Sequence, residues 1–118
     1  MPRTLVVHTT MLGAYGTYGA NLADITMAAA DVGNKQYISL VEGDILIAHN
    51  TGAGAQTVTI DSVASPTTGR TGSITTYSIG IGEYAVFGPF RLRGWGSSGL
   101  LNFEADSADV LFGVLRQA

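Results

Sequence analysis

Alternation of apolar and polar residues is the clearest pattern in this chain, and it predicts β-strands. The pattern is most regular at Gln56–Ile60 (QTVTI), where Val58 and Ile60 share one face and Thr57 and Thr59 share the other. A strand of this kind is half-buried, with its apolar face on a core. Further strands are predicted at Thr4–Thr10, Gln36–Leu40, Ile74–Ile79, Glu83–Phe87 and Leu100–Phe103, and Ala23–Ala30 is either a short strand or a helical turn.

Two segments are apolar at nearly every position. They are Asp44–His49 (DILIAH) and Val110–Arg116 (VLFGVLR). Strands that are covered on each face have this composition, so we predict such strands here, with Val110–Arg116 in the centre of a sheet. Asn50–Ala55 (NTGAGA) is small and carries glycine, which predicts a hairpin loop between Asp44–His49 and Gln56–Ile60.

Eight or nine short strands separated by turn residues are typical of an all-β sandwich. We therefore predict a single β-sandwich with jelly-roll-like connectivity. Residues 1–20 are expected to form a flexible N-terminal arm or strand, and residues 21–118 the sandwich domain. No composition shift within the second range indicates a further domain boundary.

The supply of charge is small. Charged residues make up 13% of the chain, against roughly 25% in an ordinary soluble domain, and the formal net charge is −3. Nucleic acid and anionic membranes are recognised through clustered Lys and Arg, so neither is an expected partner. The absence of cysteine excludes disulfides and thiolate sites. The apolar run at Leu5–Val7 is too short for a signal peptide or a membrane span, so we expect a soluble protein made in the cytoplasm.

Candidate metal ligands are few. His8 and His49 could meet across neighbouring strands and bind a metal together with Asp44, but the short ligand spacings typical of zinc sites are absent. Each histidine lies at or near the end of a predicted strand, which favours a half-exposed ring that is hydrogen-bonded to backbone. The sequence therefore assigns no metal site.

Catalytic motifs are equally weak. The acidic residues Glu104, Asp106 and Asp109 could serve glycoside hydrolysis or calcium binding, but a solvated turn before the last strand is the favoured interpretation. Gly80–Gly82 precedes a strand rather than a helix, so it does not form a phosphate site, and Gly96–Gly99 (GSSG) is not a nucleophile elbow. We assign no catalytic residue and no cofactor, and we expect no enzymatic activity.

Three aromatic residues, Tyr15, Tyr18 and Trp95, lie in glycine-rich segments that are expected to be loops. Such rings can anchor a protein interface or stack on sugars or bases. For Trp95 a third interpretation is that the ring folds back over one end of the sandwich as a lid on the core. All three interpretations stay open at this point.

A series of short motifs runs through the second half of the chain. They are Asn50-Thr51, Thr57–Thr59 (TVT), Gly69–Gly72 (GRTG), Gly82–Phe90 (GEYAVFGPF), Gly94-Trp95 and the closing Val114–Arg116 (VLR). This series resembles a family of small head proteins of tailed bacteriophages. The resemblance covers about two thirds of the chain and is weakest before Ala20. Its motifs are structural turns and strands, and none is a catalytic signature.

The resemblance implies a virion structural protein, a capsid decoration (cement) protein on the capsid exterior. It implies a homo-oligomer, with a trimer favoured, that binds the lattice of the major capsid protein and stabilises the head. The N-terminal segment up to Asn21 would then lie along capsid subunits. Arg70, Arg91, Arg93 and Trp95 are the expected loop contacts, with Tyr15 and Tyr18 as further candidates, although Arg70 could equally tie down its own turn.

Two other functions fit the same sequence. The first is another virion part, such as a neck, tail or fibre-associated subunit, which composition does not distinguish from a head protein. The second is a carbohydrate-binding module in which Tyr15, Tyr18 or Trp95 forms the stacking platform.

Overall fold

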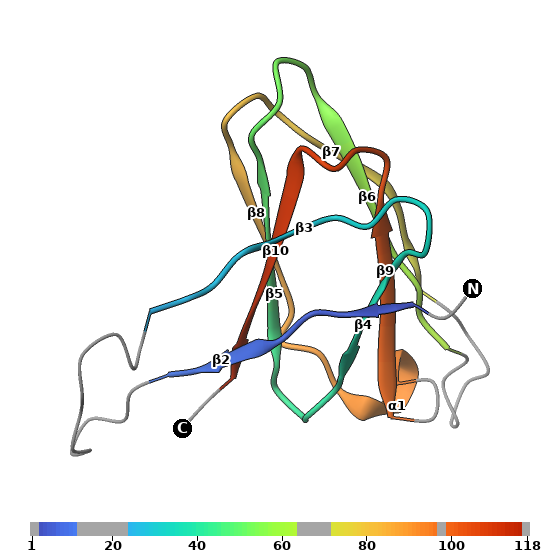
Figure 1. Cartoon of the computed structure of the whole chain (residues 1–118). Coiled ribbons are helices and arrows are strands. Elements are labelled where there is room, and N and C mark those ends of the chain that lie inside the picture. Colours follow the sequence, from blue (N-terminus) through green and yellow to red (C-terminus); the bar gives the residue numbers. More distant parts are fainter. Residues whose placement is uncertain (1–2, 12–23, 64–71, 97–98, 117–118) are drawn as a thin grey trace.

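The computed structural model describes residues 3–11, 24–63, 72–96 and 99–116 of the chain (Figure 1). In this part the chain forms ten strands and one short helix. The elements are β1 (Thr4–Leu5), β2 (His8–Thr10), β3 (Ala28–Ala29), β4 (Gln36–Ser39), β5 (Ile45–Asn50), β6 (Gln56–Ile60), β7 (Ile74–Ile79), β8 (Tyr84–Phe87), α1 (Leu92–Trp95), β9 (Leu100–Ala105) and β10 (Val110–Arg116).

The strands form two sheets, and the all-β sandwich predicted from the sequence is confirmed. The first sheet has the order β1-β4-β9-β6-β7. The second has the order β2-β10-β5-β8, and β3 pairs with β10 as well. The central position predicted for Val110–Arg116 is also confirmed, since β10 pairs with β2, β3 and β5.

The core lies between the two sheets, where the inward-facing residues of both sheets meet. Val58 and Ile60 are fully buried, as the alternation in β6 predicts. Phe103 of the first sheet packs edge-to-face on Phe112 of the second, with ring centroids 4.7 Å apart, a favourable aromatic geometry. The core is therefore one continuous apolar cluster that holds both sheets together.

The hairpin predicted at Asn50–Ala55 is wrong, because β5 and β6 belong to different sheets. The reason is the buried side chain of Asn50. Its Nδ2 donates to the carbonyl oxygens of Gly54 (2.8 Å) and Ile79 (3.0 Å), and its Oδ1 accepts from the amide of Gly52 (2.9 Å). These bonds tie the loop to the end of β7, so the chain crosses over the sandwich instead of turning back along β5.

Most consecutive strands cross between the sheets in this way, which divides the molecule into two ends. The upper end in Figure 1 carries the connections β5–β6, β7–β8 and β9–β10, and the lower end carries the β4–β5 connection and α1. Two long sides remain, where the edges of both sheets lie. We call them the β1–β2 side and the β7–β8 side.

The β1–β2 side is formed by the start of the chain. β1 pairs in parallel with β4, with Thr4 opposite Gln36, and β2 pairs in parallel with β10, with His8 opposite Val114. Residues 4–10 of the predicted arm are therefore integral to both sheets. The remainder of that predicted arm, from residue 12 onward, lies outside the described residues.

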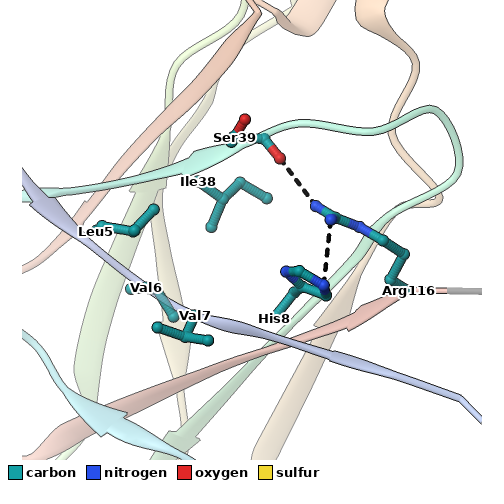
Figure 2. A pocket seen from close by; sticks show the side chains of 7 residues that line it. All are labelled: Leu5, Val6, Val7, His8, Ile38, Ser39 and Arg116. Carbon is teal, nitrogen blue, oxygen red and sulfur yellow. Dashed lines mark hydrogen bonds between the residues drawn. The ribbon is translucent and has the colours of Figure 1, made fainter.

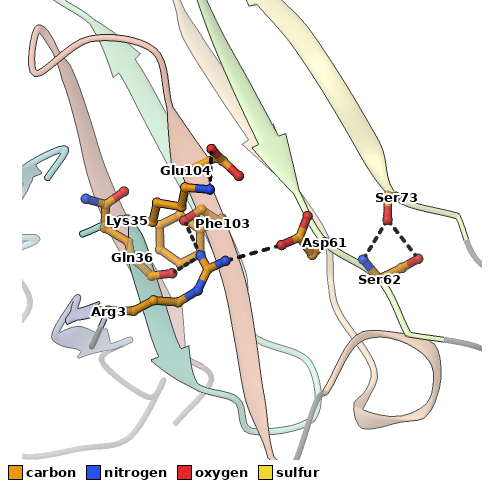
Figure 3. A network of polar contacts seen from close by, with 8 residues as sticks. All are labelled: Arg3, Lys35, Gln36, Asp61, Ser62, Ser73, Phe103 and Glu104. Atoms are coloured by element: carbon orange, nitrogen blue, oxygen red, sulfur yellow. Dashed lines mark hydrogen bonds and ion pairs between the residues drawn. The ribbon is translucent and has the colours of Figure 1, made fainter. Parts of the chain in front are cut away.

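Arg3 fastens this segment to the first sheet (Figure 3). Its Nη1 donates to the carbonyl oxygens of Gln36 (3.1 Å) and Phe103 (3.2 Å), and its Nη2 lies 3.5 Å from a carboxylate oxygen of Asp61. One side chain thus spans β4, β9 and the end of β6. Lys35 adds an ion pair with Glu104, at 3.4 Å, on the same sheet.

Candidate functional site

The contact residues predicted from the sequence separate in the structure. Arg91 and Arg93 are both exposed at the lower end, before and within α1. Within the described residues neither forms an ion pair. Arg70, Tyr15 and Tyr18 lie outside the described residues.

Trp95 packs toward the core. Its ring lies edge-to-face on Phe90, with centroids 4.9 Å apart, and Phe90 is only 2% exposed. α1 is a short irregular turn rather than a regular helix, since Gly94 has a φ of 89° that a side chain rarely adopts. This turn places the indole over the lower end of the core, which favours the lid interpretation of Trp95 over that of a free stacking platform.

A pocket of about 360 Å³ opens beneath the β1–β2 side (Figure 2). Leu5, Val6, Val7 and Ile38 line its apolar part, and the polar groups of His8, Ser39 and Arg116 close one end. Pockets of this size and character can take a small apolar molecule that carries an anionic group. Whether this pocket does so depends on the free donors of Arg116.

Contacts within the protein engage most of the N–H donors of the Arg116 guanidinium. Nε and Nη2 donate to the two carboxylate oxygens of Asp44, at 3.0 and 2.9 Å, and Nη2 also donates to the carbonyl oxygen of Ser39 (2.9 Å). Nη1 lies 3.2 Å from His8 Nε2. Asp44 is only 1% exposed, so this bidentate pair neutralises a buried charge. The group is therefore structural, and it locks β10 to the β4–β5 connection.

The structure separates the two histidines that could have met across neighbouring strands. His8 lies opposite Val114 and His49 opposite Leu111, so the two rings sit at different levels of the second sheet. His49 stacks on Tyr84 with ring centroids 3.8 Å apart. No group of three His, Asp or Glu side chains is suitably placed for a metal ion in the part of the chain that the structure describes.

The acidic residues before β10 have structural contacts. The Glu104 carboxylate pairs with Lys35, and the Asp106 carboxylate accepts from the amide of Thr57 at 3.0 Å. The backbone amide of Asp109 donates to Ser107 Oγ at 3.1 Å. The Asp106 contact fastens the upper end of β6, and the Asp109 contact shapes the β9–β10 turn. Asp106 and Asp109 thus lie in the turn favoured from the sequence, whereas Glu104 lies within β9.

The outer face of the second sheet is the most unusual surface of the described chain, because it is apolar. The outward residues of β5, β8 and β10 are Ile45, Ile47, His49, Tyr84, Val86, Leu111, Gly113 and Leu115. In a two-sheet sandwich this face ordinarily carries polar residues. We call this surface the outer apolar face.

Part of the outer apolar face is covered by the chain itself. Gly113 is buried, and a Cβ at this position would come within 2.9 Å of Ile25 Cδ1. The segment before β3 therefore lies across the middle of β10. Coverage stops short of β8, where Tyr84 and Val86 are 64% and 65% exposed.

Sequence reasoning missed this surface although its signal was present. The apolar composition of Asp44–His49 and Val110–Arg116 predicts burial of both faces. In the structure one face lies in the core and the outward side chains of β5 are half-buried. The same pattern therefore indicates a face that is suited to a partner as much as one that is covered by the chain itself.

No protein family, curated protein or solved structure matches this chain. Within the described residues no helix is both long and apolar enough to span a membrane.

Proposed function

We propose that this chain is a non-enzymatic structural protein of a virion, a capsid decoration (cement) protein that binds the major capsid protein on the outside of the head. The observation that carries the proposal is the outer apolar face. A chain with 13% charged residues and an apolar sheet face turned outward has the composition of an assembly subunit, since interface centres are depleted in charge. The resemblance of its turn and strand motifs to phage head proteins supports the same role.

The proposed mechanism is mechanical. The outer apolar face would bury Ile45, Ile47 and Leu115 against capsid subunits, and the exposed Arg91 and Arg93 at the lower end would supply polar contacts at the rim. Neither contact requires a cofactor, a metal ion or a reaction. The chain would add binding energy across neighbouring capsid subunits and so stabilise the head.

Copy number in purified particles tests this role. We expect hundreds of copies per particle by quantitative mass spectrometry against the major capsid protein. A neck, tail or fibre-associated subunit would be present in only a few copies, and that result would contradict decoration.

The binding surface is tested with a matched pair of variants. Ile47→Lys places a charge in the outer apolar face and is expected to weaken capsid binding at least about tenfold. Val32→Lys, at an exposed valine between β3 and β4 and away from the proposed contacts, should bind like the wild type. Circular dichroism melting confirms that both variants fold. Equal capsid binding by the two folded variants would exclude this face as the contact.

A further inference from the structure

We propose that β8 is a self-association edge, and that a second copy of this chain pairs with it antiparallel about a two-fold axis. The proposal goes beyond attachment to a capsid, because it concerns the contact between copies, and it places a two-fold dimer where the resemblance implies a trimer. It begins with the edges of the two sheets, where a β-strand leaves its N–H and C=O groups unpaired and available to another chain.

Three of the four edges are poor templates for pairing. β1 has two residues, and β2 and β3, which share one edge of β10, have three and two. β7 is longer, but its register with β6 shifts between Val58 and Ile60, and Thr76 has a positive φ of 48°. Short strands and bulges are devices that protect edges from pairing.

β8 lacks these protections. Tyr84–Phe87 (YAVF) carries no charge and no proline, and it keeps an unbroken register with β5 from Tyr84 to Phe87. No described strand pairs with its other edge. Exposed large apolar side chains gather on this side of the molecule, and they are Tyr77 (48%), Ile81 (63%), Tyr84 (64%) and Val86 (65%).

The hydrogen-bond pattern sets the available groups. The Glu83 carbonyl oxygen accepts from the amide of Asn50 at 3.0 Å. In an antiparallel pair every second residue bonds to the neighbouring strand, so the carbonyl oxygens of Glu83, Ala85 and Phe87 point toward β5. Those of Tyr84 and Val86 then point outward. A two-fold axis through Ala85 places Tyr84 of each copy opposite Val86 of the other, where the strands exchange both N–H···O=C bonds and form an aromatic–β-branched pair.

The charges beyond the two ends of β8 favour the antiparallel arrangement. Glu83 directly precedes β8 at the upper end, and the exposed Arg91 follows it at the lower end. Antiparallel pairing brings the end that bears Glu83 in one copy beside the end that bears Arg91 in the other. Parallel pairing would align Glu83 with Glu83, and like charges at such a contact are unfavourable.

The test uses the full-length chain in solution, with sedimentation velocity from micromolar to millimolar concentration. We expect a reversible dimer. Val86→Lys should weaken its association at least about tenfold, because it removes the aromatic–β-branched pair with Tyr84 and places on the edge a residue type that disfavours strand pairing. Val7→Lys is the matched control, at a valine of similar exposure (69%) on the opposite side, and should dimerise like the wild type.

Single cysteines report the register, since the natural chain has none. Under oxidation, a mixture of Tyr84→Cys and Val86→Cys should form the mixed disulfide faster than either variant links to itself, because paired strands hold Cα atoms at about 5.5 Å. A monomeric wild type overturns the β8 contact and leaves the capsid experiments above unaffected. A trimer, or loss of association in Val7→Lys, overturns the two-fold arrangement in favour of a head-to-tail one.

Discussion

The sheet edges on the β1–β2 side and on the β7–β8 side of the sandwich differ in how they are covered. On the β1–β2 side the start of the chain pairs with both sheets, and the side chains of Arg3, Asp31 and Arg116 hold it through hydrogen bonds, the last of them at His8. On the β7–β8 side the sheets meet through the edge-to-face contact of Tyr77 with Phe87, at 5.3 Å, and the residues beyond it are exposed and apolar. The first side is completed by the chain itself, whereas the second is suited to completion by another molecule.

The largest effect is expected on the β1–β2 side, from Arg116→Ala. This change leaves the Asp44 carboxylate buried without its partner, which costs about 3–5 kcal/mol of unfolding free energy. Urea unfolding measures the loss. Arg91→Ala removes an exposed arginine without a described ion pair and should change the stability by less than about 0.5 kcal/mol. A wild-type unfolding midpoint in Arg116→Ala would show that the Arg116–Asp44 pair does not stabilise the β1–β2 side.

A smaller effect is expected on the β7–β8 side, from Tyr77→Ala. The edge-to-face contact with Phe87 contributes about 1 kcal/mol beyond the area it buries, and Tyr77 is already 48% exposed. Thermal unfolding should show a modest decrease, and Tyr77→Phe, which keeps the ring, should restore the wild-type value. A loss as large as that in Arg116→Ala would remove the proposed difference between the two sides.

The smallest effect is local and depends on pH. The Thr4 hydroxyl, at 2.6 Å, and then the Asn34 side chain and amide lower the pKa of the Asp31 carboxyl below its usual range. A lowered pKa means that this carboxylate stabilises the fold above its unfolded pKa, and that the contribution is lost as pH falls through the lowered value.

Amide exchange followed by NMR tests this link. At acid pH below the lowered pKa, the protection of the Thr4 amide, which donates to the Lys35 carbonyl oxygen at 2.8 Å, should decrease. In Asp31→Asn the protection should lose this pH dependence, whereas Asp24→Asn, at an exposed aspartate, should keep it. Acid-independent protection of Thr4 in the wild type would contradict the role of Asp31.

Much of the fold was predictable from local pattern. β6, β7 and β10 occupy the predicted ranges. β4, β8 and β9 differ from theirs by one or two residues at one end, and β5 by one residue at each end. Alternation fixes which residues share a face and therefore which ones reach a core. Thr4–Thr10 was predicted as one strand and forms two, because Val6 enters the core between them while the chain passes from one sheet to the other.

The candidate surface was less predictable. The pairing of Asp44 with Arg116 and the stacking of His49 on Tyr84 have no signal in the sequence, because each joins residues that lie far apart along the chain. Asp44 and Arg116, for example, are separated by 72 residues. The exposure of Val86 depends on β8 lying at an edge of its sheet. Strand order is a property of long-range pairing, so a strand's own residues do not reveal whether it lies at an edge.

The sequence by itself determined that the protein is a small all-β sandwich with little charge. The low charge follows from the composition, and the strands follow from the alternation of apolar and polar residues. Only the tertiary structure decided which apolar face of β5 and β10 is the core and which is turned outward. The two faces have nearly the same composition, and the difference arises because the first sheet covers one of them while the segment at Ile25 covers only part of the other. This partial cover leaves the outer apolar face exposed at β8, and the proposed function rests on that face.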